Sequence, residues 1–152
     1  MWHSSPEGLY ENQDPAQAEM NLRGRFLSDG GGTFAFTTVM PAGYPIPDDG
    51  PVGELLRLAG RHKFRPAHLH FMVYKPGFKT LISQLYVAED PHLESDVQFG
   101  VTRALIGDFV LRNGPAGEPA YSLDQVFTLE PGEARRPRAP VSAKRSADAA
   151  TD

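Results

Sequence analysis

Residues 65–73, Arg-Pro-Ala-His-Leu-His-Phe-Met-Val, constrain the fold more than any other stretch of the chain. Aliphatic and aromatic residues alternate there with histidines, a pattern typical of a β-strand. Because side chains two apart on a strand share a face, His68 and His70 point one way and Leu69 and Phe71 the other. A helix would separate the two imidazoles by roughly 200°. The pattern predicts a strand with one core face and one face that holds either half of a metal site or ordinary half-exposed polar side chains.

Short strand-like segments separated by turns occupy most of the remaining chain. Alternating patterns cover residues 21–27, 33–39, 79–87 and 121–129. The sequence Asp-Gly-Gly-Gly at 29–32 is typical of a hairpin turn. Residues 51–60 are expected to form a short helix, because proline suits a first turn and glycine the position after a last one. Together these patterns predict a mainly β fold, an antiparallel β-sandwich with one or two short helices.

The composition predicts one globular domain and excludes several classes of site. A chain of 152 residues, 40% hydrophobic and 22% charged, is ordinary for a single domain. We expect that domain over residues 1–130. Residues 131–152, rich in proline, alanine, arginine and serine, are predicted to be a disordered tail. Because the chain has no cysteine, disulfides, zinc–thiolate sites and thiol nucleophiles are excluded.

Charge and hydropathy limit the classes of partner that the protein can bind. The net charge is −4, and residues 131–152 hold five bases against three acids, so residues 1–130 carry −6. An acidic body argues against a nucleic-acid partner, since binding to phosphates needs a basic face. No apolar run approaches the roughly 18 residues of a membrane span, and the first residues lack the pattern of a signal sequence. We therefore expect no membrane partner and a cytoplasmic protein.

A metal site on the histidine face needs further ligands. A carboxylate would complete an iron(II) triad of two histidines and one carboxylate, but none follows within five residues of His70. A cupin motif is also disfavoured, because Tyr74 and His62 stand where that motif has a glutamate and a glycine.

Two tyrosines are the more conspicuous candidates. Tyr10 lies in a loop, and Tyr44 lies in the proline-rich segment 41–47, which would fix the orientation of its ring. Two other interpretations stay open from the residues alone. Carboxylates such as Glu11 or Asp14 could join the histidines in a different metal oxygenase or hydrolase. Alternatively, the histidines and tyrosines could be packing and surface residues of a non-catalytic β-sandwich binding module.

Three segments together resemble the intradiol ring-cleavage dioxygenases. They are residues 21–26 (Asn-Leu-Arg-Gly-Arg-Phe), 43–53 (Gly-Tyr-Pro-Ile-Pro-Asp-Asp-Gly-Pro-Val-Gly) and 65–70 (Arg-Pro-Ala-His-Leu-His). They occur in the order and at the spacing of that family, and the similarity runs from about Trp2 to Leu129. The resemblance implies the β-sandwich catalytic domain of that family and a non-haem iron(III) cofactor.

The resemblance also implies which residues form the site. The implied iron ligands are Tyr10, Tyr44, His68 and His70. The residues implied to line the substrate pocket are Arg65, Gln84, Val97 and Gln98, and Tyr44, Arg65 and Gln84 are implied to act in catalysis. Ionising one tyrosine at pH 7 costs about 4 kcal/mol and two cost about 8. Two phenolate ligands are therefore expected only with a strongly Lewis-acidic ion, and ferric iron has that character.

The implied reaction opens an aromatic 1,2-diol between its hydroxyl-bearing carbons with both atoms of O2. Residues 93–101 resemble the hydroxyquinol branch, so hydroxyquinol (benzene-1,2,4-triol), opened to maleylacetate or 3-hydroxymuconate, is the expected substrate, with catechol as the alternative. The implied partners are thus a small aromatic diol and O2.

The resemblance also bears on assembly. The family has an N-terminal helical dimerisation segment and further strands before the position of Trp2, so it implies a homodimer for the full-length form and an N-terminally truncated catalytic domain here. We expect residues 1–152 alone to expose an open strand edge and an apolar face around Leu22, Phe34 and Phe36. Such edges and faces favour self-association or marginal stability.

Overall fold

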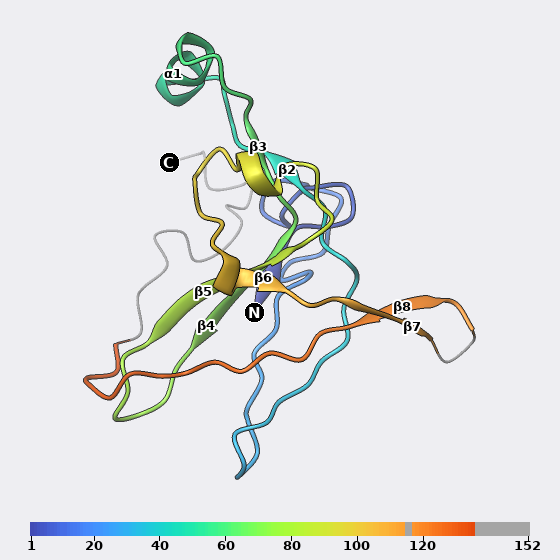
Figure 1. The fold of residues 1–152 in the computed structure, drawn as a ribbon, viewed down its shortest axis with the longest axis vertical. Coiled ribbons are helices and arrows are strands. Elements are labelled where there is room, and N and C mark those ends of the chain that lie inside the picture. The colour runs from blue at the N-terminus through green and yellow to red at the C-terminus, as the bar shows by residue number, and fades with distance from the viewer. Residues whose placement is uncertain (115–116, 136–152) are drawn as a thin grey trace, which may run out of the picture.

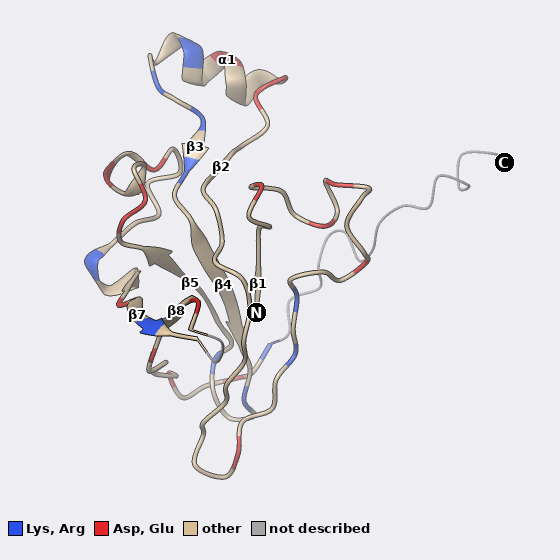
Figure 2. Ribbon diagram, turned by 90° about the vertical axis from the view of Figure 1, so that its right-hand side faces the viewer, with Lys and Arg blue, Asp and Glu red and all other residues tan. Residues whose placement is uncertain are grey.

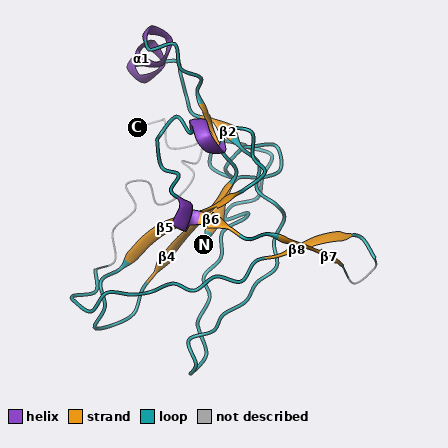
Figure 3. Ribbon diagram, viewed as in Figure 1, coloured by secondary structure: helices purple, strands orange, loops and turns teal. Residues whose placement is uncertain are grey.

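Strand is the main regular structure of the protein, and it is joined by long loops (Figures 1 and 3). A computed structural model describes residues 1–114 and 117–135. The strands are β1 (Trp2–His3), β2 (Tyr44–Pro45), β3 (Phe64–Arg65), β4 (His68–Val73), β5 (Leu81–Val87), β6 (Ile106–Gly107), β7 (Val110–Asn113) and β8 (Pro119–Ser122). The helices are α1 (Pro51–Leu58) and two 3-10 turns, η1 (Leu93–Ser95) and η2 (Arg103–Leu105).

The largest sheet has the strand order β1-β4-β5-β6. Its β1/β4 and β4/β5 pairs are antiparallel and its β5/β6 pair is parallel. In Figure 2, β1, β4 and β5 lie side by side, and the charged residues lie mostly in the loops around them. A turn joins β4 to β5, where the Phe78 N–H donates to the Lys75 carbonyl and Gly77 takes a φ of 81°, which glycine accommodates freely. The strands expected within residues 65–73 and 79–87 are confirmed.

The core lies on one face of β4 and β5. Leu69, Phe71 and Leu85 are buried there. Aromatic side chains from the loops pack on this face: the Phe71 ring lies 4.8 Å from that of Phe127 and 6.4 Å from that of Phe36. The strand alternation therefore divides the sheet into a hydrophobic face and a second face that carries the histidines.

Two of the expected strands do not form ladders. The 29–32 turn exists, since the Asp29 N–H donates to the Thr33 carbonyl and the Asp29 carboxylate accepts from the Thr33 N–H. Beyond it, however, the two limbs diverge (Figure 1). Three rings stack on one another with centroids 4.8–6.5 Å apart, those of Phe26, Phe34 and Phe36. The two segments therefore contact each other through side chains, without backbone pairing. The expected strand 121–129 is likewise wrong after Ser122, where β8 ends.

The described strands form one sheet of four strands and two sheets of two. The mainly β class is confirmed, while the two-layer sandwich stays a prediction. The expected helix is also confirmed as α1, with Pro51 in its first turn and Gly60 past its end at a φ of 61°. α1 stands apart from the sheet (Figure 1). Among the described residues, no helix has the length and apolarity needed to cross a bilayer.

Only the start of the predicted tail is described. Pro131 bridges Phe78, and the Gly132 N–H donates to the Gly77 carbonyl at 2.9 Å. Residues 131–135 thus lie against the turn between β4 and β5. The rest of the predicted tail, residues 136–152, lies outside the described residues.

Candidate metal centre

The face of β4 opposite the core carries the two histidines. His68 is buried and His70 is half-buried, and their Nε2 atoms lie 3.0 Å apart. Across the ladder His68 faces Tyr86 and His70 faces Gln84, so the polar residues of both strands share this face. The prediction that the two imidazoles point the same way is confirmed.

Both tyrosines reach the histidines, Tyr10 from a loop and Tyr44 from the short strand β2. Tyr44 begins β2, which pairs with β3, and its hydroxyl lies 3.4 Å from the His68 Nε2. The Tyr10 hydroxyl donates to the Tyr44 hydroxyl at 3.1 Å. Gly8 makes this approach possible: its φ is 79°, and a Cβ there would lie 3.0 Å from the Gly43 carbonyl oxygen. Four donor atoms, the Oη atoms of Tyr10 and Tyr44 and the Nε2 atoms of His68 and His70, therefore converge; we call them the donor cluster.

The His68 tautomer follows from its hydrogen bonds. Its Nδ1 lies 2.6 Å from the Pro66 carbonyl oxygen, which can only accept, so Nδ1 carries the proton. The lone pair of the neutral ring is then on Nε2, the atom that faces the other donors. A backbone partner at one ring nitrogen that orients the other is the usual arrangement for a metal-binding histidine.

Burial keeps the imidazoles neutral. It lowers the pKa of His68 to about 4 and, with the nearby charge of His68, the pKa of His70 to about 3. Burial and the neighbouring Tyr44 raise the pKa of the Tyr10 phenol well above its ordinary value. At pH 7 both imidazoles thus present lone pairs, whereas the Tyr10 phenol keeps its proton unless a cation favours the phenolate.

Arg65 connects the donor cluster to the pocket residues. Its Nη1 donates to the His68 Nε2 at 3.1 Å, and its Nη2 donates to the Tyr86 hydroxyl at 2.8 Å and to the Gln84 side-chain Oε1 at 3.5 Å. Its Nε and Nη2 also bind the carboxylate of Asp96 at 3.2 and 3.3 Å. Burial is the largest single influence and opposes the charge of Arg65, but the hydrogen bond to Asp96 and the electrostatic attraction of Tyr44, Tyr86 and Asp96 together outweigh it and raise the pKa of Arg65.

The remaining pocket candidates lie in the loop after η1. Val97 is buried and its N–H donates to the Phe64 carbonyl at 3.2 Å. Gln98 is exposed, and its N–H donates to the Asp96 carboxylate at 3.2 Å. The structure brings Arg65 and Gln84 to the donor cluster. Contact of Val97 and Gln98 with a substrate stays a prediction.

Carboxylates do not complete this site. Glu11 binds Arg23 at 3.0 Å. In residues 1–114 and 117–135, no group of three or more histidine or carboxylate side chains is placed to share an ion. The alternative of Glu11 or Asp14 joining the histidines is therefore not supported.

The donor cluster fits one hard cation. Consecutive donor atoms lie 3.1, 3.4 and 3.0 Å apart along the series Tyr10, Tyr44, His68, His70. Atoms that bind one ion at about 2.0–2.1 Å are separated by roughly 2.9–3.4 Å. Two phenolates and two neutral imidazoles would also reduce a 3+ charge to 1+, which leaves a cation for a diol dianion. The chemistry and spacing of the donors thus suit ferric iron.

Sequence reasoning missed three residues of this site. Tyr86 follows Gln84 at strand spacing, so the alternation of β5 could have indicated it. Trp2 faces His70 across the β1/β4 ladder, and its indole stacks on the imidazole at 4.7 Å with planes 5° apart. Asp96 is 31 residues from Arg65, and no local pattern indicates their contact.

Comparison with known proteins assigns the chain to a family. The model of a family described as "Dioxygenase" matches residues 1–130. The chain is 45% identical over 130 residues to the 6-chlorohydroxyquinol 1,2-dioxygenase of Cupriavidus pinatubonensis, covering 86% of this chain and 46% of that protein. It is 46% identical over 110 residues to the hydroxyquinol 1,2-dioxygenase of a Rhizobium species, covering 72% and 37%. A solved structure of hydroxyquinol 1,2-dioxygenase from Pseudomonas putida superposes with a TM-score of 0.79 at 42% identity, covering 86% and 49%.

The family model gives the broad class, and the named relatives give the kind of dioxygenase family. The chain belongs to the intradiol ring-cleavage dioxygenases, a family of non-haem iron enzymes. The chain spans about half the length of the relatives that it matches.

Proposed function

We propose that this protein binds one ferric ion through Tyr10, Tyr44, His68 and His70 and opens an aromatic 1,2-diol with O2. The observation that carries the proposal is the convergence of the four donor atoms, with neighbours 3.0–3.4 Å apart, on the polar face of β4. Membership of the intradiol family supports the same assignment. When bound, the ferric ion would supply a Lewis-acidic centre for both oxygens of the diol.

Side chains of the protein would accept protons that the diol loses. A diol must lose two protons to bind as a dianion. The Tyr44 hydroxyl is half-buried and lies between the Tyr10 hydroxyl and the His68 Nε2. Following the resemblance to the intradiol family, we assign it as base for the diol. Tyr10, which is also half-buried and whose backbone N–H donates to the Gln13 side chain, is assigned to hold the ion throughout.

Arg65 would stabilise negative charge on the substrate, and Gln84 would orient it. Arg65 stays cationic at any working pH, and its Nη1 already lies 3.1 Å from the His68 Nε2. A fixed cation at that place stabilises negative charge that develops on the substrate ring and on oxygen. Gln84 lies directly across the ladder from His70, where its amide can orient a substrate oxygen. In the balanced reaction, each new carboxyl group keeps one hydroxyl oxygen of the diol and gains one atom of O2.

We propose hydroxyquinol as the preferred diol. Relatives named as acting on hydroxyquinols match at 42–46% identity, against 34–38% for relatives named as acting on catechol or chlorocatechol. Residues 93–101, between β5 and η2, carry the resemblance to the hydroxyquinol branch. Catechol remains the second candidate.

The test is turnover by the iron-loaded protein. Oxygen uptake and product mass are measured with hydroxyquinol and with catechol, beside a protein-free blank that corrects for autoxidation. We expect a product heavier than the substrate by one O2 molecule, with both atoms drawn from isotopically labelled O2, and a higher kcat/KM for hydroxyquinol. Tyr44→Phe is expected to lose most activity, whereas Tyr121→Phe, at a half-exposed position in β8, serves as the matched control.

Two results would overturn parts of the proposal. Iron-loaded protein that consumes no O2 with either diol would contradict the assigned reaction. Full activity in Tyr44→Phe would contradict the role given to that hydroxyl. A preference for catechol would replace only the substrate.

A further inference from the structure

The loop that follows η1 contains a buried carboxylate with four hydrogen-bond donors. The Asp96 Oδ1 accepts from the Arg65 Nε and from the Gln98 N–H, both at 3.2 Å. Its Oδ2 accepts from the Arg65 Nη2 at 3.3 Å and from the Gly100 N–H at 2.9 Å. The side chain of Asp96 is 2% exposed, so these protein groups replace water as its partners. One carboxylate thus holds both a guanidinium and its own loop.

The position of the Arg65 guanidinium, fixed by Asp96, determines how Arg65 meets the donor cluster. Because the guanidinium of arginine is planar and rigid, binding Nε and Nη2 to one carboxylate also sets where Nη1 points. That Nη1 points at the His68 Nε2. An ion that binds Nε2 would take the lone pair that Nη1 now uses. Asp96 and Tyr86 would then be the partners that keep Arg65 in place, with one N–H free toward the pocket.

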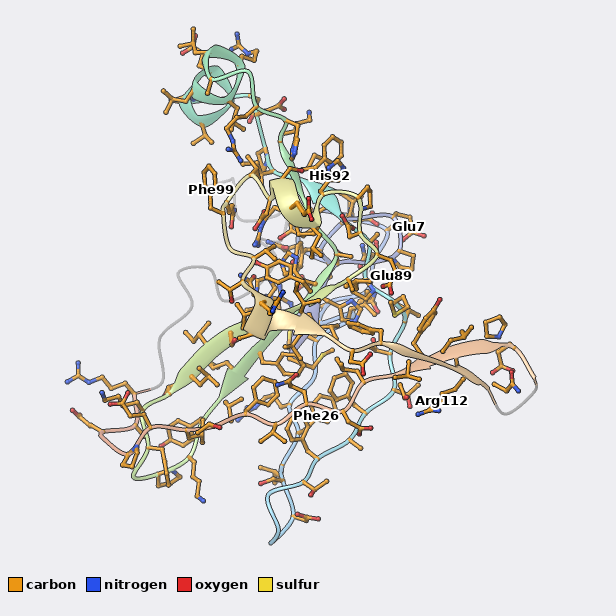
Figure 4. All side chains as sticks on the ribbon, in the orientation of Figure 1. Glu7, Phe26, Glu89, His92, Phe99 and Arg112 are labelled. Carbon is orange, nitrogen blue, oxygen red and sulfur yellow. The ribbon has the colours of Figure 1, made fainter. Side chains whose placement is uncertain are left out.

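The far end of the same loop lies on this group of side chains. A Cβ on Gly100 would lie 2.5 Å from the Tyr86 hydroxyl, 3.0 Å from the Gln84 Nε2 and 3.1 Å from the Arg65 Nη2. The loop backbone therefore forms a wall directly beside Arg65. Between its two anchored ends, Phe99 points outward and is 75% exposed (Figure 4), so burial in a core does not hold this ring. The Arg61 guanidinium lies 3.9 Å from the centre of the Phe99 ring and donates to the Asp96 backbone carbonyl, so it supports the loop from the solvent side.

We propose that Asp96 is a positioning residue for ring opening. It holds Arg65 in the plane that directs Nη1 to the reacting ring, and it holds the 96–100 loop against that cation. This inference rests on the proposed function. Because displacement of a positioned group by about 1 Å can cost on the order of 10²-fold in rate, kcat should fall by about that factor in Asp96→Asn. The substituted amide presents an N–H group toward Arg65 in place of a carboxylate oxygen.

The first experiment compares kcat, KM and bound iron in wild type, Asp96→Asn and Glu94→Gln. Glu94 is an exposed residue of η1, so its substitution removes the same charge two positions away without touching Arg65. We expect Asp96→Asn to keep stoichiometric iron, since Asp96 contacts none of the four donor atoms, and to lose mainly kcat. Glu94→Gln should match wild type. Asp96→Asn with a kcat within twofold of wild type would overturn the inference.

A double-mutant cycle with Arg65→Lys tests whether Asp96 acts through Arg65. If it does, the double variant should lose little more kcat than either single variant, because coupled residues are not additive. Losses that multiply would show independent roles and overturn the inference. Should Asp96→Asn fail to fold, Gly100→Ala, which crowds the same cluster from the loop, replaces it in this comparison, with the same expected loss of kcat and retention of iron.

A measurement without iron separates the inference from the proposed function. In metal-free protein, the backbone amides of Gln98 and Gly100 should exchange with solvent slowly in wild type and faster in Asp96→Asn. Equal exchange in both proteins would show that Asp96 does not hold the loop. If wild type lacks turnover but the two proteins differ in exchange as expected, the proposed function is contradicted. The inference that Asp96 holds the 96–100 loop is then still supported.

Discussion

The metal-free protein should lose stability when it is acidified from pH 7.5 to pH 5. His68 and His70 face each other with Nε2 atoms 3.0 Å apart, and burial lowers their pKa values to about 4 and about 3. In the unfolded chain both return to the ordinary value of about 6.5. The unfolded chain therefore takes up two protons near pH 6.5 that the folded protein refuses until much lower pH.

The size of the loss follows from these pKa values. The contribution is fully present above pH 6.5 and is lost progressively as the pH falls toward the folded values. Integrated from pH 7.5 to pH 5, each histidine costs about 2 kcal/mol of unfolding free energy, and the pair costs about 4 kcal/mol. This is most of the stability of a domain at the lower end of the usual 5–15 kcal/mol.

The other groups with shifted pKa values do not reverse the predicted loss of stability on acidification. Burial also lowers the pKa of His3 and of the Met1 amine, so both add to the loss on acidification. Asp96 behaves oppositely: burial alone would raise its pKa, but the hydrogen bonds from Arg65 and from the loop backbone lower it below 3.8. Its contribution is present above pH 3.8 and lost only below that value, outside the interval tested.

The assay is urea unfolding of metal-free protein at pH 7.5, 6 and 5. His70→Gln should reduce the loss from about 4 to about 2 kcal/mol, because one proton-binding difference is removed. His92→Gln, a substitution outside the donor cluster, is the matched control and should keep the wild-type pH dependence. A wild-type unfolding free energy that changes by less than about 1 kcal/mol over this interval would refute the reasoning.

Three further predictions test the core and the donor cluster. Phe71→Ala should cost about 3–5 kcal/mol in chemical unfolding, because Phe71 is 5% exposed in the aromatic core, whereas Met72→Ala, at a position 44% exposed, should cost under about 1 kcal/mol. Trp2 is the only tryptophan and stacks on His70, so bound ferric iron should quench its fluorescence in wild type but not in His70→Ala; unchanged emission on loading would place the iron elsewhere. Iron content should fall sharply in His70→Ala and much less in Tyr44→Phe, since we assign Tyr44 mainly to turnover; equal losses would contradict that division.

Local periodicity was sufficient for the parts of the fold whose partners are near in sequence. The alternation around His68 and His70 predicted the strand and the shared face, and the positions of Pro51 and Gly60 predicted α1. These patterns work because side-chain direction and backbone conformation are set within a few residues. The same alternation at residues 33–39 predicted a strand that does not form, because an alternating pattern does not show whether a second backbone lies near enough to pair.

The candidate site shows the same division. The histidine pair follows from strand geometry. The tyrosines stood out as candidates in the sequence but were assigned as ligands only by the resemblance, because 24 residues separate Tyr44 from His68. Asp96 had no local pattern at all. Its role depends on the return of a loop to Arg65, a tertiary contact that depends on the path of the chain through β4 and β5.

The visible absorption spectrum of the iron-loaded protein tests the central assignment most directly. Two tyrosinate ligands on ferric iron should give a charge-transfer band that colours the protein red to burgundy, with one iron per chain, and Tyr10→Phe should weaken the band or lose the metal. A colourless preparation that holds stoichiometric ferric iron would contradict the assignment of Tyr10 and Tyr44 as ligands.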